Sequence, residues 1–223
     1  MEPRYERNMP ALTEAECQIL RKKRILVVGC GGLGGHIIDM LARIGIGSLR
    51  VVDGDVFEAT NLNRQLLSQI PLLGVSKAVA AAEHIARVNP DIQTEAVKTF
   101  LTAENAADLV AGCDAVLDAL DNIPSRKILA AACTQAGIPY IYGAIRGWVA
   151  QAAVSMPDDG LINKLFPEDV VIRDKSVLSF TPAMCASMQV SLAVKLLTGR
   201  SVETGTIYYF DLLNQEFETI TIV

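Results

Sequence analysis

The chain has 223 residues, of which 51% are apolar, so it is long enough for one α/β domain with a large buried core. Its formal net charge is −5 and it has no lysine or arginine block longer than the four residues 21–24, which excludes the usual electrostatic footprint of a nucleic-acid-binding protein. The N-terminus has no apolar signal core, and no apolar run is expected to reach the roughly 18 residues that span a bilayer. We therefore expect a cytoplasmic protein with neither a nucleic-acid nor a membrane partner. Five scattered cysteines predict free thiols.

Short apolar runs alternate with amphipathic stretches over the first 145 residues, which is typical of a mostly parallel sheet with helices on both faces. The expected strands are 25–28, 48–52, 92–97, 115–120 and 139–142. The expected helices are 35–44, 76–88, a helix capped by Thr102 that runs to about Ala111, and 125–136, which Gly137 closes.

The last third of the chain has a different pattern. Strands are expected at 148–155, 207–210 and 217–222, and they extend the sheet with antiparallel pairs. The segment 156–180 has no clear periodicity, as in a functional crossover or loop. Thr181-Pro182 then starts a helix that ends at Gly199 and is apolar nearly all round, so it must be buried in this core or against another subunit.

The predicted fold class is therefore α/β, a Rossmann-like and mostly parallel sheet with helices on both faces, extended by C-terminal antiparallel strands. We expect one domain over residues 1–223. It divides into an N-terminal arm (1–24), a nucleotide-binding half (25–147) and a second half (148–223) that contains the crossover segment.

A glycine-rich turn, Gly29-Cys30-Gly31-Gly32-Leu33-Gly34, follows the first expected strand. Gly29, Gly31 and Gly34 have the spacing of a dinucleotide fingerprint, and the helix after them directs free N–H groups at a bound anion. The motif alone does not separate NAD, FAD and ATP, and a turn packed for structural reasons would have the same sequence. Asp53 ends the second strand at the spacing of a ribose-binding acid, although it could instead cap the loop.

Four further polar clusters bear on the choice of nucleotide. They are Asn61 to Gln65 in a loop, Lys77 at the start of a helix, Asp121-Asn122 at the end of a buried strand, and Arg7 in the N-terminal arm. Transfer of a phosphoryl or nucleotidyl group depends on stabilising phosphate charge, so Arg64 and Lys77 favour ATP over NAD. Asp121, at the carboxyl end of a central strand, is predicted to hold Mg²⁺ together with phosphate oxygens.

In this order, these residues resemble the MoeB/ThiF/HesA family, the bacterial relatives of ubiquitin-activating enzymes, over nearly the whole chain. The matching segments are 4–8, 29–34, 52–55, 61–65, 74–77, 117–122 with Arg126, and 142–144. The resemblance implies an adenylyltransferase that acts on a small ubiquitin-fold carrier protein ending in Gly-Gly. The carrier's terminal carboxylate would attack the α-phosphate of MgATP to give an acyl adenylate and pyrophosphate.

The family pattern also implies a role for individual residues. Arg64, Lys77 and Arg7 would contact the phosphates, and Arg7 would reach across from the second subunit of a homodimer. Asp121 would hold Mg²⁺ and Asp53 the ribose. The other residues expected at the nucleotide are Gly29, Gly31, Gly32, Gly34, Asp55, Asn61, Gln65 and Asn122. A carboxylate that is already ionised at pH 7 needs no general base, which suits a chain with two histidines.

The chain departs from the family pattern at its cysteines. Many members bind zinc through two Cys-x-x-Cys pairs, but this sequence has neither, and the first would fall near Leu161 and Lys164. A structural zinc site needs four ligands, so we expect none here. The crossover stretch has Arg173, Asp174 and Lys175 where some relatives have a cysteine that bonds the carrier, so we expect no thiolate chemistry there. Cys30 is expected to be a packing residue in its turn.

Two other kinds of function stay open at this level. The first is an NAD-dependent oxidoreductase, in which Arg64 and Lys77 would face solvent and not phosphates. The second is a nucleotide-binding module that keeps the fold without turnover, although the combination of Arg64, Lys77 and Asp121 argues against it. The sequence leaves the carrier's pathway open among molybdopterin, thiamine, cysteine and other sulfur-transfer routes.

Overall fold

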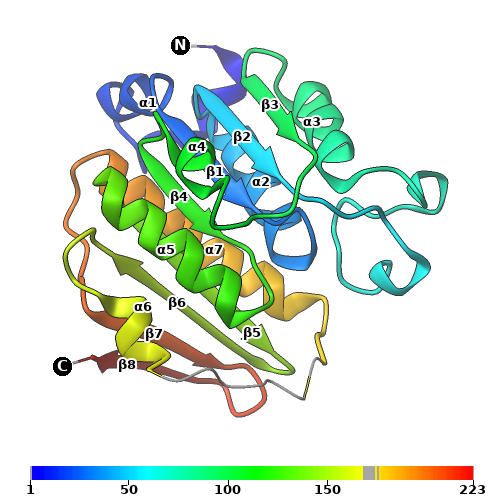
Figure 1. The fold of residues 1–223 in the computed structure, drawn as a ribbon. Coiled ribbons are helices and arrows are strands. Elements are labelled where there is room, and N and C mark those ends of the chain that lie inside the picture. Colours follow the sequence, from blue (N-terminus) through cyan, green and yellow to red (C-terminus); the bar gives the residue numbers. More distant parts are fainter. Residues whose placement is uncertain (1, 168–173, 175, 223) are drawn as a thin grey trace.

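The computed structural model describes residues 2–167, 174 and 176–222. The strands of this part of the chain form one eight-stranded sheet in the order β3-β2-β1-β4-β5-β6-β7-β8 (Figure 1). They are β1 (Arg24–Val28), β2 (Ser48–Val52), β3 (Gln93–Val97), β4 (Ala115–Asp118), β5 (Tyr140–Arg146), β6 (Val149–Ser155), β7 (Thr206–Asp211) and β8 (Glu216–Thr221). The strands from β3 to β5 are parallel and the pairs from β5 to β8 are antiparallel, which confirms the predicted fold class.

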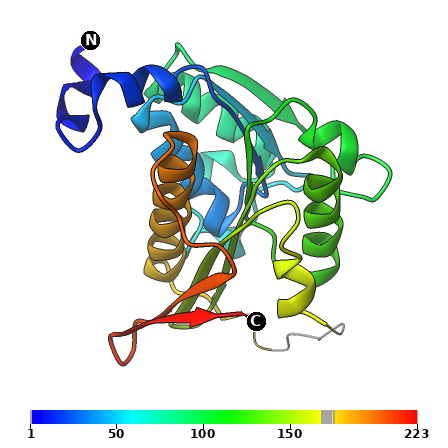
Figure 2. The same cartoon turned by 90° about the vertical axis from the view of Figure 1, so that its left-hand side faces the viewer.

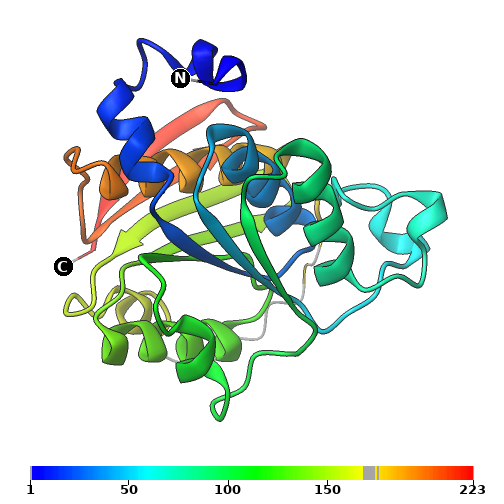
Figure 3. The ribbon, with the colours of Figure 1, turned by 90° about the horizontal axis from the view of Figure 1, so that it is seen from above.

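Helices cover both faces of the sheet, as Figure 2 shows. One face carries α1 (Glu14–Leu20), α2 (Gly32–Ile44), α3 (Lys77–Val88) and α7 (Phe180–Leu197), and the other carries α4 (Ala106–Val110), α5 (Ile123–Ala136) and α6 (Leu161–Leu165). Short 3₁₀ helices occupy Pro3–Asn8 (η1), Ala59–Asn61 (η2) and Ile70–Leu72 (η3). The segment between β2 and α3, which contains η2 and η3, extends away from the sheet (Figure 3).

The first strand shows why the sequence forms this layered core. Ile25 and Val27 belong to the apolar cluster under α2 and α7, while Leu26 and Val28 belong to the cluster under α4 and α5. Successive side chains of a strand point to opposite faces, so a strand covered on both faces must be apolar throughout.

Several element boundaries differ from the prediction for local polar reasons. The helix after the glycine turn begins at Gly32 and not at Gly35. The expected helix cap at Thr102 is wrong, because α4 begins at Ala106 and the Asn105 side chain accepts from the Thr102 N–H at 2.9 Å. Similarly, β4 ends at Asp118, whose carboxylate accepts from the Leu120 N–H at 2.8 Å and starts the turn there.

The C-terminal half has a longer hairpin and one more helix than predicted. The strand β5 continues to Arg146 and pairs with β6 along its whole length. The segment expected to lack regular structure contains α6. The helix α7 begins at Phe180, so Thr181 and Pro182 lie inside its first turn.

The helix α7 is the longest helix in the described part of the chain. Its 18 residues are long and apolar enough to cross a membrane by length and composition, so the expectation that no run reaches this length is wrong. Half of this helix is buried inside the fold, against α2, β5 and β6. Its buried Gln189 donates hydrogen bonds to the carbonyls of Asp118 at 2.8 Å and Ile141 at 3.0 Å. The prediction that this helix is buried is therefore confirmed for half of its residues.

Candidate functional site

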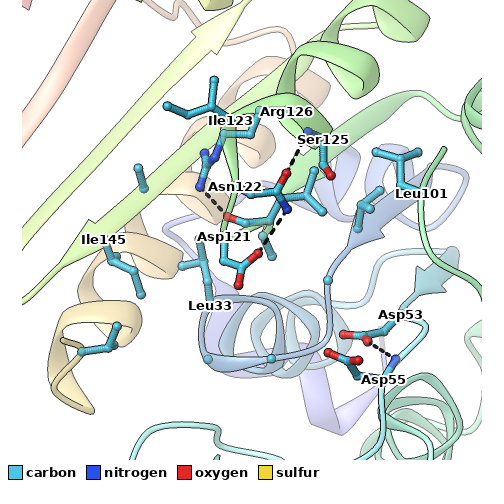
Figure 4. A pocket seen from close by; sticks show the side chains of 18 of the residues that line it. Leu33, Asp53, Asp55, Leu101, Asp121, Asn122, Ile123, Ser125, Arg126 and Ile145 are labelled. Carbon is cyan, nitrogen blue, oxygen red and sulfur yellow. Dashed lines mark hydrogen bonds between the residues drawn. The ribbon is translucent and has the colours of Figure 1, made fainter. Parts of the chain in front are cut away.

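A cavity of about 580 Å³ opens at the carboxyl ends of β1, β2, β4 and β5. From β1 the chain moves to β2 on one side and later to β4 on the other, so this is the point where an open α/β sheet binds its ligands. The predicted residues that line the cavity are Gly29, Gly31, Gly32, Asp53, Asp55, Arg64, Gln65, Lys77, Asp121 and Asn122. Figure 4 shows Asp121 and Asn122 on one wall and Asp53 and Asp55 on another.

The glycine turn brings the backbone of Gly29, Gly31 and Gly32 to the cavity. Gly29 has φ = +98°, and a Cβ there would lie 2.5 Å from the Ala119 carbonyl oxygen. A Cβ on Gly34 would lie 1.8 Å from the Gly29 carbonyl oxygen, so Gly34 closes the turn and does not line the cavity. No side chain caps the start of α2 at Gly31, so the first N–H groups of this helix are left for a ligand.

Asp53 is held in a fixed orientation at the end of β2. Its Oδ2 accepts from the Cys30 N–H at 2.7 Å and its Oδ1 from the Asp55 N–H at 2.8 Å. Burial raises the pKa of the Asp53 carboxyl, and the two N–H donors oppose this shift by stabilising the charged form. Asp53 therefore caps the loop and also lines the cavity, and its carboxylate can still accept from further hydroxyl groups.

Four cationic side chains of the described residues line the cavity, and two of them, Lys77 and Arg64, were predicted from the sequence to contact phosphates; the others are Arg126 and Arg146. Lys77, the first residue of α3, is only 7% exposed, and its Nζ lies 3.3 Å from Oδ2 of Asp55. Arg64 is oriented by bonds from its Nη1 to the Thr60 carbonyl and to Oδ1 of Asn63, both at 2.9 Å. Both side chains therefore line the cavity, whereas the NAD-dependent alternative expected them to face solvent.

The adjacent Gln65 and Asn61 differ in what they do. Gln65 is 7% exposed, and its buried Oε1 has no hydrogen-bond partner in the described part of the chain. A buried acceptor without a partner is costly, so a donor from a bound ligand would stabilise it. Asn61 does not line the cavity. Its Oδ1 accepts from the Glu58 N–H at 3.0 Å, so this side chain shapes the loop.

Asp121 lies in the cavity wall, but not as the sequence led us to expect. It is exposed and follows the turn after β4, so the prediction that it closes a buried strand is wrong. The buried carboxylate at the end of that strand is Asp118, which has no exposed surface. Asn122 caps α5 by accepting from the Ser125 N–H at 2.9 Å and also donates to Oδ1 of Asp121 at 3.2 Å.

A buried polar layer, made of Asp118, Arg126, Tyr140 and Gln189, adjoins the cavity, and Arg126 also lines it. The Arg126 Nη1 donates to Oδ2 of Asp118 and to the Gly143 carbonyl, both at 2.6 Å, and its Nη2 donates to the Leu120 carbonyl. Tyr140 donates to the same Asp118 oxygen at 2.5 Å. Burial raises the pKa of the Asp118 carboxyl, and the Arg126 guanidinium opposes that shift.

No role was predicted for this layer, although the sequence contains one signal of it. A charged residue inside the apolar run Val116-Leu117-Asp118 requires a buried partner of opposite charge. Arg126 supplies it from the next helix. Because Arg126 also binds the Leu120 carbonyl, the pair fixes the turn that presents Asp121.

Other predicted residues lie outside this chain's cavity or outside the described residues. Arg7 is exposed on η1 and does not line the cavity of its own chain. Arg173 and Lys175 lie outside the described residues, and Asp174 lines the cavity. Cys30 is fully buried, and burial raises the pKa of its thiol well above the ordinary value, which agrees with a packing role.

The family model described as "ThiF family" matches residues 5–223 of this chain. The chain belongs to the ThiF family. It is 37% identical over 209 residues to the SAMP-activating enzyme E1 of Haloferax volcanii, covering 90% of this chain and 77% of the relative. It is 35% identical to the probable adenylyltransferase/sulfurtransferase MoeZ of Mycobacterium tuberculosis, covering 98% of this chain but only 59% of that longer protein. A sulfur carrier protein adenylyltransferase of Thermus thermophilus is 31% identical, covering 98% of this chain and 86% of the relative.

Solved structures of the same family fold agree with this assignment. The E. coli tRNA N6-threonylcarbamoyladenosine dehydratase superposes with a TM-score of 0.75 at 25% identity, covering 88% of this chain and 94% of that chain. The structure of E. coli MccB with ATP superposes with a TM-score of 0.82 at 19% identity, covering 100% of this chain and 72% of that chain. At that identity the second likeness concerns the fold alone.

Proposed function

We propose that this ThiF-family chain adenylates the C-terminal glycine of a small ubiquitin-fold carrier protein that ends in Gly-Gly, with ATP as the second substrate. The observation that carries the proposal is the convergence on a single cavity of a helix start without a side-chain cap, the cations of Arg64 and Lys77, and the carboxylates of Asp53 and Asp121. The named activities of relatives that are 31% and 37% identical support it further. The carrier's pathway stays open.

The chain's own residues would perform alignment and charge neutralisation. A carboxylate oxygen of the carrier forms a bond to the α-phosphorus of ATP, and the bond from that phosphorus to the bridging oxygen breaks to release pyrophosphate. Both reactants are anions, so Arg64, Lys77 and the N–H groups at the start of α2 would offset their repulsion. Asp53 would hold the ribose hydroxyls and fix the position of the α-phosphate.

The donor set at Asp121 suits magnesium. Mg²⁺ prefers one or two protein carboxylates together with phosphate oxygens and water, and Asp121 offers an exposed carboxylate in the cavity wall. Asp121 would hold the ion there, where it would supply positive charge to the phosphates. No zinc is included in this proposal.

The proposal includes a homodimer in which Arg7 of one subunit acts in the cavity of the other. Its support is that Arg7 is exposed and lies outside the cavity of its own chain. A second subunit would bring this cation to the phosphates.

The test is exchange of labelled pyrophosphate into ATP, measured with and without a candidate carrier protein ending in Gly-Gly. We expect exchange that requires the carrier, survives Cys30→Ser and is lost in Asp121→Ala. Circular dichroism of each variant would control for folding. Exchange without any carrier would contradict the proposal. No exchange with any small protein ending in Gly-Gly that the same genome encodes would also contradict it, and so would full exchange by Asp121→Ala.

A further inference from the structure

Phe100, just after β3, is an aromatic side chain that the fold leaves uncovered. It is 62% exposed, and it lines the cavity together with its neighbours Thr99 and Leu101. Large aromatic side chains are stabilised by burial, so an exposed one on a cavity wall has a surface available to a ligand.

The chain contains a glycine whose lack of a side chain makes room for this ring. A Cβ on Gly54 would lie 2.6 Å from Cδ2 of Phe100 and 2.7 Å from its Cγ. Gly54 is not among the glycines with positive φ, so its backbone does not require glycine. The ring therefore lies directly against the backbone next to Asp53, the residue proposed to hold the ribose.

The backbone that carries Phe100 is itself fixed. The Asn105 side chain donates from Nδ2 to the Phe100 carbonyl at 2.9 Å, and its Oδ1 accepts from the Thr102 N–H at 2.9 Å. One side chain therefore closes the turn between β3 and α4 and sets the position of the ring.

We propose that Phe100 is the platform on which the base of the bound nucleotide stacks, and that Asn105 is a positioning residue for it. The inference rests on the proposed function in that the ligand is ATP. A base is attached to the ribose, so a ribose held at Asp53 places the base beside the nearest aromatic wall, which is Phe100 over Gly54. Stacking on an aromatic ring is tolerant of base identity, so Phe100 would contribute affinity for nucleotides in general.

The test is calorimetric titration of the full chain with ATP, AMP and tripolyphosphate, the last of which has the phosphates without ribose or base. Phe100→Ala should raise the Kd for ATP and AMP about tenfold and leave that for tripolyphosphate unchanged. Phe100→Tyr should bind like the wild type because it keeps the aromatic face. Phe217→Ala removes a similarly exposed phenylalanine, 59% exposed and outside the cavity lining, and is the matched control.

Two further variants test the geometry. Gly54→Ala should weaken ATP binding by displacing the ring, and combining it with Phe100→Ala should add little to the loss. Asn105→Asp keeps the acceptor for the Thr102 N–H but loses the donor to the Phe100 carbonyl, so it should weaken the binding of ATP but not that of tripolyphosphate.

The outcomes separate this inference from the function on which it rests. An unchanged Kd for ATP in Phe100→Ala, or equal losses for ATP and tripolyphosphate, would overturn the inference and leave the proposed adenylation standing. A wild-type chain that binds no ATP would overturn both.

Discussion

Asp118 ends β4 and Asp121 follows three positions later, after the turn, yet the two residues belong to regions with opposite requirements. Asp118 is fully buried in the polar layer and receives hydrogen bonds from Arg126 and Tyr140. Asp121 is exposed on the cavity wall. The same side chain is therefore part of the fold in one position and available to a ligand in the other.

The difference follows from solvation. A charge taken out of water costs several kcal/mol unless a partner and hydrogen bonds offset the loss, which explains the number of donors around Asp118. An exposed carboxylate keeps its water and needs no such partners. We therefore expect changes in the buried polar layer to lower stability, and changes at the cavity wall to lower activity at nearly constant stability.

The largest expected effect is that of Arg126→Ala on stability. Removing this guanidinium leaves Asp118 charged and buried without its ion-pair partner, so the free energy of unfolding should fall by about 3–5 kcal/mol. Urea denaturation followed by circular dichroism measures it. Arg87→Ala breaks an exposed pair with Glu83 and should change the same quantity by less than about 1 kcal/mol. A loss of under 1 kcal/mol for Arg126→Ala would mean that the layer is not needed for the fold.

Lys77→Met tests the cavity side of the comparison at a residue that is itself buried. Methionine keeps an apolar stem of similar length, and the Asp55 carboxylate left behind is mostly exposed. The free energy of unfolding should therefore change by only about 1 kcal/mol or less. Carrier-dependent pyrophosphate exchange should fall about 100-fold, because the cation proposed to stabilise phosphate charge is gone. A variant that loses stability and activity together would instead assign Lys77 to the fold.

The sequence predicted the fold well because its alternation of apolar runs and helix-period stretches is dictated by burial on both sheet faces. It also predicted the residues that gather at the cavity, since the carboxyl ends of parallel strands meet there. It misjudged Asp121 because periodicity does not show where a strand ends, and that boundary depends on the hydrogen bond from Leu120 to Asp118. No sequence pattern indicated Phe100, because its place on the cavity wall depends on its contact with Gly54, which is distant in the sequence.

The proposed role of Arg7 in the partner's cavity predicts complementation between two inactive variants. In a mixed dimer of Arg7→Ala and Asp121→Ala, one cavity has both an intact Asp121 and an intact Arg7 only if Arg7 acts across the interface. Random mixing should then restore about a quarter of wild-type exchange, since half of the dimers are mixed and each has one complete site. The two variants are mixed and allowed to exchange subunits in dilute urea, and the exchange of labelled pyrophosphate into ATP is then measured. No recovery, with mixed dimers verified by mass spectrometry, would place Arg7 outside the shared site.

The smallest effect concerns Asp39, a carboxylate on α2 that belongs to neither region and tests how little a surface pair contributes. Hydrogen bonds from His84 and Arg43, both at 2.8 Å, lower its pKa from the ordinary 3.8 to about 2. A carboxyl whose pKa is lower in the folded chain stabilises the fold above pH 4, and this contribution is lost as the pH falls toward 2. Asp39→Asn should therefore lower the free energy of unfolding at pH 7 by about 1 kcal/mol or less, a difference that shrinks below pH 4 and in high salt. Urea titrations from pH 7 to pH 3 measure the difference, and a constant value over that range would assign the effect to packing and not to charge.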